Sequence, residues 1–343
     1  MTPPLRFAIF GAGFWARVQL AAWREVGATE CVAIYNRSRD KAEAFARDLG
    51  VPAVYDDAEK LLHEVKLDFV DNITEVGGHK PLSLLCAKHR IPCICQKPLA
   101  ASLKDARRMV AAFANAKTPF FVHENWRWQS TMRALVDTLR SGVIGTPFRG
   151  RFTMISGFDV WANQPALREL EQFILTDLGV HLLDTARACF GEAQSVYCQL
   201  HKTLAPAVKG DNVATLLLSM GRAQTSVVME IAYAKTPLER ECFPQTLAFV
   251  EGPRGSIEVA DDYWLRVTTK RGTQSRRHAP PRYAWADPRY DLAHASMVPC
   301  HRDLLAALRG EKPGETTGAD NLKTMELVFA AYESARREQV VKL

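Results

Sequence analysis

The chain has 343 residues, of which 47% are hydrophobic and 24% are charged, the balance of an ordinary globular protein. This length favours two domains over one, and the composition excludes a disordered or fibrous chain. The net charge is +6 and the basic residues are dispersed, so no nucleic-acid surface is indicated. The basic residues between Lys270 and His278 are expected to lie in a solvent-exposed loop.

The N-terminus lacks the features of a secretory signal, and no apolar run reaches the length of a membrane span. We therefore expect a cytoplasmic protein with no membrane partner. Its eight cysteines form no CxxC pair and no His/Cys cluster with metal-ligand spacing, so we expect reduced core thiols and no metal. They are Cys31, Cys86, Cys93, Cys95, Cys189, Cys198, Cys242 and Cys300.

The first third of the chain alternates strand and helix signals. Strands are expected at 6–10, 30–35, 53–55, 69–73, 92–95 and 119–123, with helices at 16–26, 39–49, 58–64, 79–89 and 103–115. Strands joined by helices of this length form a parallel sheet covered on both faces. We therefore predict a doubly wound α/β Rossmann domain over residues 1–125.

Residues 126–343 follow a different pattern. After a helix at 131–141, alternating segments joined by short turns predict strands at 148–155, 195–200, 214–220, 225–233, 246–250, 256–259 and 264–270. Helices are expected at 299–309 and 322–338, and their apolar spacing suits packing back on the first domain. This second domain is predicted to be α+β, with a large, mostly antiparallel, open-faced sheet for substrate binding and oligomerisation.

A glycine-rich turn, Gly11-x-Gly13-x-x-Ala16, follows the first strand and opens the first helix. The first glycine permits the turn, and the second lets a pyrophosphate approach the helix N-terminus. The motif alone also fits a plain tight turn. Its strand–helix–strand context favours dinucleotide binding, with Phe14 and Trp15 beside the cofactor.

The second strand is followed by Asn36, where NAD-binding proteins commonly place a carboxylate for the ribose hydroxyls. Asn36 has no charge to repel a 2′-phosphate, and Arg37 and Arg39 are able to pair with one. Asparagine also hydrogen-bonds ribose, and arginine stacks on adenine. The sequence therefore leaves NAD and NADP open, with a solvated turn as the alternative.

The apolar run 91–95 stops at Gln96-Lys97-Pro98, which places one ammonium group at the end of a buried strand. Lysines usually lie in solvent. Here the preceding residues favour burial and the proline restricts the backbone, so Lys97 is the first candidate for catalysis.

Asp177 and His181 lie four residues apart at the start of a predicted helix, which puts them on one face. A helix cap at Asp177 and a core histidine at His181 are the alternatives. Together with the lysine and a bound dinucleotide, a histidine that changes charge near neutral pH indicates an alcohol/ketone oxidoreductase.

The order and spacing of several motifs resemble the Gfo/Idh/MocA family, which includes glucose-fructose oxidoreductases and inositol dehydrogenases, over essentially the whole chain. The motifs are Gly11-x-Gly13, Lys97-Pro98, Asn125-x-Arg127, Asp177-x-Gly179-x-His181, Glu251-Gly252-x-x-Gly255 and the segment 317–335. The resemblance implies that Lys97 lies between nicotinamide and substrate. It further implies that His181 accepts the proton and that Asp177 orients the substrate.

The same resemblance implies that Ile73, Thr74 and His79 contact the cofactor, together with Gln96 and Lys97. Two positions depart from the family pattern, because Gln96 replaces the usual Glu and Glu75 replaces the usual Pro. Gln96 still donates and accepts hydrogen bonds, so activity is expected to survive. Cofactor affinity is the property that these departures affect.

Substrate specificity is expected from segments 123–129 and 158–161, and in particular from Asn125, Trp126, Arg127 and Trp161. Aromatic rings beside polar side chains suit a sugar, and hinge packing between domains is the alternative. Arg127 is also able to hold a carboxylate. The segment resembles a branch of the family that includes apionate-type sugar-acid oxidation.

We predict an NAD(P)-dependent dehydrogenase of a sugar, polyol or sugar acid, and a homodimer or homotetramer joined through the open sheet face. Two other classes stay open. One is a catalytically silent sensor or co-repressor on the same fold, and the other is a dehydrogenase of a non-sugar carbonyl. The presence together of Lys97, Asp177 and His181 argues against the sensor.

Overall fold

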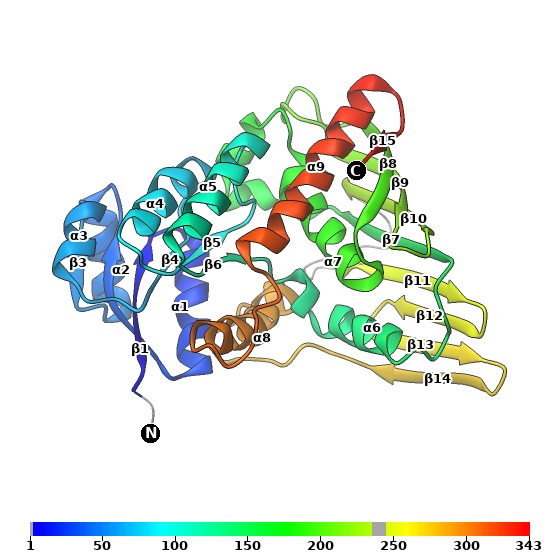
Figure 1. Cartoon of the computed structure of the whole chain (residues 1–343), viewed down its shortest axis with the longest axis horizontal. Helices are drawn as coiled ribbons and strands as arrows, with labels where there is room; N and C mark the ends of the chain where they lie inside the picture. Colours follow the sequence, from blue (N-terminus) through cyan, green and yellow to red (C-terminus); the bar gives the residue numbers. More distant parts are fainter. Residues whose placement is uncertain (1–2, 235–244) are drawn as a thin grey trace. The chain divides into compact units, whose positions relative to one another are not determined.

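A computed structural model describes residues 3–234 and 245–343 of the chain. The chain divides into two units, whose segments can be followed by colour in Figure 1. The first unit contains Met1–Glu124 and Met297–Met325, and the second contains Asn125–Ser296 and Glu326–Leu343. No helix in the described part of the chain is long and apolar enough to cross a membrane.

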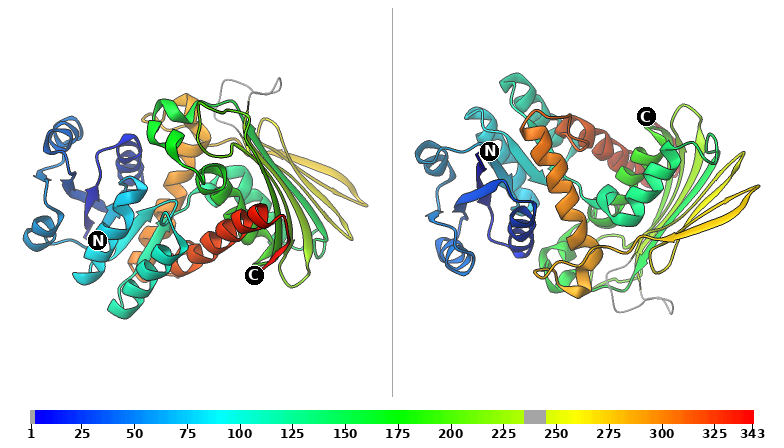
Figure 2. Two further views of the ribbon diagram at one scale, coloured as in Figure 1. Left: turned by 90° about the horizontal axis from the view of Figure 1, so that it is seen from above. Right: turned by 90° about the horizontal axis from the view of Figure 1, so that it is seen from below.

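Among the described residues, the first unit holds a parallel six-stranded sheet in the order β3-β2-β1-β4-β5-β6. Strands β4 and β6 are buried along their whole length, which is typical of a parallel sheet with helices on both faces (Figure 2). The predicted doubly wound fold is confirmed. The strands are β1 Leu5–Phe10, β2 Thr29–Tyr35, β3 Ala53–Tyr55, β4 Phe69–Asn72, β5 Cys93–Gln96 and β6 Phe120–His123. The helices are α1 Phe14–Val26, α2 Arg39–Leu49, α3 Ala58–Glu64, α4 Val76–Lys88 and α5 Leu103–Ala116.

A late segment of the chain returns to the first unit. The Val122 N–H of β6 donates to the Thr316 carbonyl oxygen at 2.8 Å. The His301 ring stacks on the Trp23 indole of α1, with ring centroids 3.9 Å apart. These contacts explain why residues 297–325 group with the first unit.

The second unit is built on a nine-stranded sheet within the described ranges, in the order β14-β13-β12-β11-β7-β10-β9-β8-β15. Neighbouring strands run antiparallel except β7 and β10, which pair in parallel, so the sheet is mostly antiparallel as predicted. The strands are β7 Arg149–Ser156, β8 Ala193–His201, β9 Val213–Met220, β10 Thr225–Tyr233, β11 Leu247–Gly252, β12 Gly255–Ala260, β13 Trp264–Thr269, β14 Gly272–Arg277 and β15 Val341–Lys342. Helices α6 Ser130–Arg140 and α7 Val180–Phe190 belong to this unit, whereas α8 Asp291–Leu308 and α9 Gly318–Arg337 each have residues in both units. Short helical turns lie at η1 Trp126–Trp128, η2 Val160–Ala162, η3 Pro165–Glu169, η4 Leu175–Gly179 and η5 Pro288–Tyr290.

The basic segment that was expected to be a loop contains strand β14. It pairs with β13 in antiparallel register from Trp264 opposite Arg277 to Thr269 opposite Gly272. Every residue of β14 is exposed, so its composition carries no apolar alternation that would indicate a strand. Backbone pairing at the edge of the sheet stabilises this strand in place of burial.

Helix α8 begins at Asp291, eight residues before the predicted start at Pro299. Proline is favoured in the first turn of a helix, which made Pro299 a plausible first residue. It instead lies inside α8, where it removes one backbone hydrogen bond. The flanking residues of α8 are buried, and this tertiary packing outweighs the local cost.

The seven described cysteines are all free thiols, and five of them are buried. Burial raises the pKa of Cys198 to about 12, so its reactive thiolate does not form near neutral pH. Burial of these five agrees with the predicted core thiols, whereas Cys31 and Cys189 are partly exposed. Cys242 lies outside the described residues.

Candidate functional site

The turn between β1 and α1 is shaped for a phosphate group. Gly11 has φ +107°, and a Cβ there would lie 2.8 Å from the Ile73 carbonyl oxygen, so only glycine fits. Gly13 is the N-cap of α1, which has no side-chain cap and no acidic residue in its first turn. A Cβ at Gly13 would meet nothing within 4 Å. The amide groups of this helix end are therefore accessible to an anion, and the diphosphate of a dinucleotide fits here.

Asn36 lies directly beside this turn. Its Oδ1 accepts a hydrogen bond from the Ala12 N–H at 3.3 Å, while its Nδ2 donates to a backbone carbonyl two residues on, at 2.9 Å. Arg37 and Arg39 are both exposed, and Arg39 pairs with Glu43 at 2.8 Å. Of the two arginines considered for a 2′-phosphate, Arg39 thus already has an ionic partner.

A polar network ties the end of β4 to the turn after β5. Thr74 Oγ1 donates to Asn72 Oδ1 at 2.7 Å. One ring nitrogen of His79 lies 3.0 Å from the Thr74 carbonyl oxygen, and the other lies 2.9 Å from the Pro98 carbonyl oxygen. Burial lowers the pKa of His79, and a neutral ring has one N–H, so it donates to only one of these two carbonyl oxygens. The contact with Pro98 places His79 against the turn that carries the candidate lysine.

Lys97 follows β5 directly, and its side chain is half-buried. Gln96 Oε1 accepts a hydrogen bond from the Lys97 N–H at 2.8 Å, and the peptide bond between Lys97 and Pro98 is cis. A glutamate oxygen would accept the same hydrogen bond. Gln96 thus keeps this contact with the backbone while it removes a negative charge.

The predicted cofactor residues of the first unit gather at the carboxyl ends of four strands of one sheet. In an open α/β sheet this edge is where ligands bind. Phe14 and Trp15 begin α1, with their rings edge to face at 5.0 Å between centroids. By strand, the residues are Gly11, Gly13, Phe14 and Trp15 after β1, Asn36 and Arg37 after β2, Ile73, Thr74 and His79 after β4, and Gln96 and Lys97 at the end of β5.

In the second unit, Asp177 lies in η4, a π-helical turn that leads into α7. The side chain is 7% exposed, and its Oδ2 accepts a hydrogen bond from the Tyr233 hydroxyl at 2.8 Å. Burial, together with Asp177, raises the pKa of Tyr233 well above its usual range, so the hydroxyl keeps its proton and donates. The Asp177 N–H bonds to the Phe173 carbonyl oxygen at 2.9 Å, so Asp177 lies inside the helical segment and is not its cap. Single π-helical turns frequently occur at functional sites.

His181 lies one turn after Asp177 and is 4% exposed. Its ring stacks on the Trp126 indole, with centroids 4.1 Å apart and an interplanar angle of 18°. The Trp126 N–H donates in turn to Thr246 Oγ1 at 3.1 Å. The imidazole plane is therefore held by the indole, and the indole is held by its own hydrogen bond.

Two predicted substrate residues have partners within the second unit. Arg127 Nε donates to Asp184 Oδ2 at 2.7 Å, and Arg127 Nη2 donates to Asp184 Oδ1 at the same distance. Asn125 Nδ2 donates to Ser296 Oγ at 2.7 Å. The guanidinium of Arg127 is thus already paired in a bidentate arrangement, so a substrate carboxylate at Arg127 would compete with Asp184.

Tyr233 is a candidate site residue that the sequence reasoning missed. Its ring centroid lies 5.7 Å from that of Trp161, and its hydroxyl bonds to Asp177. It therefore links a predicted substrate residue to a predicted catalytic one. A tyrosine that ends a strand carries no local signal of this role, because its partner lies 56 residues away in the chain.

Known protein families match residues in both units of the chain. Residues 5–124 match the oxidoreductase family with an NAD-binding Rossmann fold, and residues 131–258 match the Gfo/Idh/MocA C-terminal domain. The chain belongs to the Gfo/Idh/MocA family. The resemblance noted in the sequence motifs is confirmed.

Members of this family from bacteria are similar over almost the full chain. D-apiose dehydrogenase of Paraburkholderia graminis is 41% identical over 336 residues, which cover 98% of this chain and 89% of the relative. D-apiose dehydrogenase of Rhizobium rhizogenes is 40% identical over 339 residues, which cover 99% and 97%. An oxidoreductase from Agrobacterium radiobacter, solved in complex with NAD+, L-tartaric acid and magnesium, has 38% identity and a TM-score of 0.95, with 98% of each chain covered. The prediction of a nicotinamide-dependent dehydrogenase acting on CH–OH groups is confirmed at this level.

Proposed function

We propose that this Gfo/Idh/MocA protein is an NAD-dependent dehydrogenase of D-apiose, a branched five-carbon sugar. The observation that carries the proposal is the extent of the match to two D-apiose dehydrogenases, at 41% and 40% identity over nearly the whole chain. A shared fold alone would support only the reaction class, since substrate choice depends on the residues of the site.

The residues of the first unit fit the cofactor. The N-terminus of α1 at Gly13 binds the diphosphate, and Asn36 faces the adenosine ribose. The relative from A. radiobacter was solved with NAD+, which supports NAD over NADP. Bound NAD supplies the hydride acceptor of the reaction.

Three residues have separate roles in the proposed reaction. His181 accepts the proton of the sugar hydroxyl, and the ammonium group of Lys97 stabilises the negative charge that develops on the same oxygen. Asp177, whose Oδ2 accepts a hydrogen bond from the Tyr233 hydroxyl, orients the sugar through its carboxylate. Trp126 keeps the His181 ring in a single plane by stacking on it.

The pairing of Arg127 favours a neutral sugar over a sugar acid. Its guanidinium is neutralised by the buried carboxylate of Asp184, so a substrate carboxylate would have to displace this partner. Oxidation of a sugar acid is the second candidate, because the A. radiobacter relative was solved with L-tartaric acid. The two candidate functions differ in the charge of the substrate. Activity measured on a panel of neutral sugars and sugar acids distinguishes them.

The panel compares D-apiose, D-ribose, D-xylose, D-apionate and L-tartrate by initial rates of NADH formation. D-apiose is expected to have a kcat/KM at least about 10-fold above that of the other compounds, since pocket contacts discriminate small changes to this extent. A maximum for D-apionate or L-tartrate would support the second candidate instead. No turnover with any of the five would contradict both.

Coenzyme choice is tested at Asn36. Asn36→Asp is expected to raise KM for NADP by roughly 10-fold and to change KM for NAD little, because the new carboxylate repels the 2′-phosphate. Arg37→Ala should also weaken NADP binding. Arg39→Ala should not, because the Arg39 guanidinium pairs with the Glu43 carboxylate. Steady-state kinetics with each coenzyme measure the effect. An unchanged NAD/NADP selectivity in Asn36→Asp would show that residue 36 does not face the ribose.

The homo-oligomer and the cytoplasmic location stay predictions. One face of the large sheet exposes apolar side chains, among them Ile155, Leu217 and Phe249, which supports association through this face. A light-scattering mass equal to that of one chain would contradict the homo-oligomer.

A further inference from the structure

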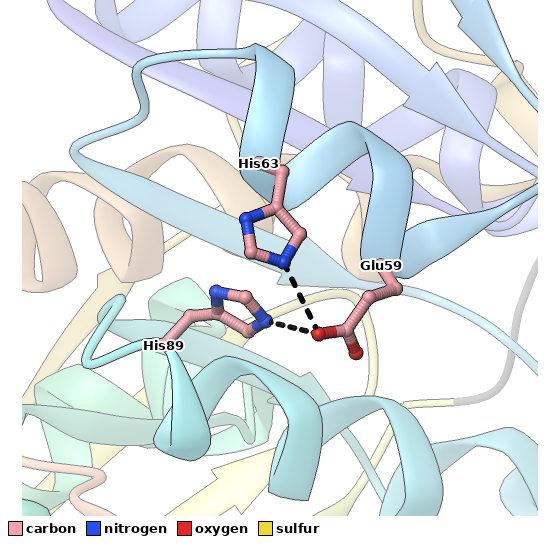
Figure 3. Close-up of side chains that lie close together, drawn as sticks. All are labelled: Glu59, His63 and His89. Carbon is pink, nitrogen blue, oxygen red and sulfur yellow. Dashed lines mark hydrogen bonds and ion pairs between the residues drawn. The ribbon is translucent and has the colours of Figure 1, made fainter.

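One carboxylate and two imidazoles meet on the surface of the first unit, apart from the residues of the candidate active site. Glu59 and His63 belong to α3, and His89 is the C-cap of α4. Their ligand atoms all lie within 4.8 Å of one another. Figure 3 shows the three side chains turned toward a common point.

The spacing of these atoms is close to that of a metal site. His89 Nε2 lies 2.8 Å from Glu59 Oε1, and His63 Nε2 lies 3.4 Å from the same oxygen. In a tetrahedral zinc site with bonds of about 2.0–2.2 Å, the ligand atoms lie about 3.3–3.6 Å from one another. Small side-chain rotations therefore bring the three ligands to this spacing without a change in the backbone.

The backbone positions of the ligands also suit a metal. Glu59 and His63 are four residues apart and share one face of α3, while His89 approaches from a second helix. The His89 side chain is 15% exposed, and that of His63 is 65% exposed. Packing thus holds His89 in place, and the exposed His63 side chain is able to adjust to the ion.

Lys88 competes for the same carboxylate. Its Nζ lies 2.9 Å from Glu59 Oε1. Lys88 Nζ donates to this oxygen, and His89 Nε2 lies 2.8 Å from it, so the carboxylate already has two partners. The Lys88 side chain is 67% exposed and has room to move into solvent. A divalent ion would then neutralise Glu59 and bind both imidazoles at once.

We propose that Glu59, His63 and His89 bind one divalent transition-metal ion, and that Zn²⁺ is the ion that suits this donor set. Three protein ligands leave a fourth position for water. The ion joins α3 to α4 within the first unit. The site is independent of the proposed sugar substrate and of the coenzyme.

The test is a calorimetric titration of the full chain with zinc chloride in the absence of chelators and coenzyme. Both His63→Ala and His89→Ala are expected to weaken Zn²⁺ binding by at least about 10-fold, because each removes a direct ligand. His201→Ala removes an exposed imidazole at the end of strand β8 in the second unit and serves as the matched control, with affinity unchanged. Lys88→Ala is expected to tighten binding several-fold, because it removes the competing cation.

Cobalt provides a second readout that does not depend on heat signals. Co²⁺ bound by the wild-type chain is expected to show the visible absorption of a tetrahedral complex, and His89→Ala should lose it. Glu59→Gln keeps the side-chain shape at a partly exposed position, so it reports on the site even if a histidine variant misfolds. Wild-type affinity for Zn²⁺ in both His89→Ala and Glu59→Gln, or no Zn²⁺ binding by the wild-type chain, would overturn the proposal.

Discussion

Replacement of Lys97 by alanine is expected to lower kcat/KM for D-apiose by at least about 100-fold. The lost ammonium group acts on the charge that develops on the substrate oxygen, and removal of one such stabilising group typically costs this much in kcat. Coenzyme affinity should change little, because Lys97 is proposed to act at the reacting end of the site. Initial rates of NADH formation and a fluorescence titration with NAD measure the two quantities separately.

Lys97→Met and Lys104→Ala are the matched variants for this experiment. Lys97→Met keeps most of the side-chain length but removes the charge, so it should be as impaired as Lys97→Ala. Lys104 is an exposed lysine at the start of α5, and its replacement should leave turnover unchanged. Near-wild-type turnover in Lys97→Met would remove Lys97 from the mechanism, even if D-apiose proves to be the substrate.

The second large effect is expected on stability. Asp184→Asn should lower the free energy of unfolding by about 3–5 kcal/mol, because it leaves the buried guanidinium of Arg127 without its counter-charge. The side chains of Arg127 and Asp184 are 7% and 0% exposed, so solvent cannot replace the lost interaction. Asp184 also pairs with Arg187 at 3.6 Å, but Arg187 retains its second ion pair, with Glu192 at 2.8 Å, in this variant. Scanning calorimetry and urea unfolding measure the change.

Asp48→Asn offers the same substitution in an exposed ion pair. Asp48 pairs with Arg17 at 2.9 Å, and both side chains are more than 40% exposed, so the cost should be no more than about 1 kcal/mol. The double variant Arg127→Met/Asp184→Leu should recover most of the stability, because it removes both charges together. Equal unfolding free energies for Asp184→Asn and Asp48→Asn would show that the buried pair contributes little.

The elements of the first unit were predictable to within three residues at nearly every boundary. Their strands are short apolar runs between turn residues, and their helices have apolar residues at helical spacing, so the signal is local. The same holds for Gly11 and Gly13, whose spacing before a helix indicates a phosphate site. Lys97 was also accessible to this reasoning, because it interrupts an apolar run at its end.

Edge strands and helix starts were less predictable. Strand β14 is fully exposed and forms through hydrogen bonds to β13, so its own residues carry no pattern of burial. The start of α8 at Asp291 was hidden because Pro299 is a strong local signal for a first turn. In both segments a contact with another part of the chain decided the structure.

The sequence by itself determined the Rossmann domain, the glycine-rich turn, the family and the types of the candidate site residues in each unit. Only the tertiary structure decided what these residues contact. Arg127 meets Asp184 and Asp177 meets Tyr233 across 57 and 56 residues of chain, and His89 reaches Glu59 across 30. A helix or strand can be recognised from the pattern of apolar residues two to four positions apart, because the backbone periodicity sets that spacing. A side-chain pair between distant segments depends instead on how the whole unit packs, and no local pattern records it.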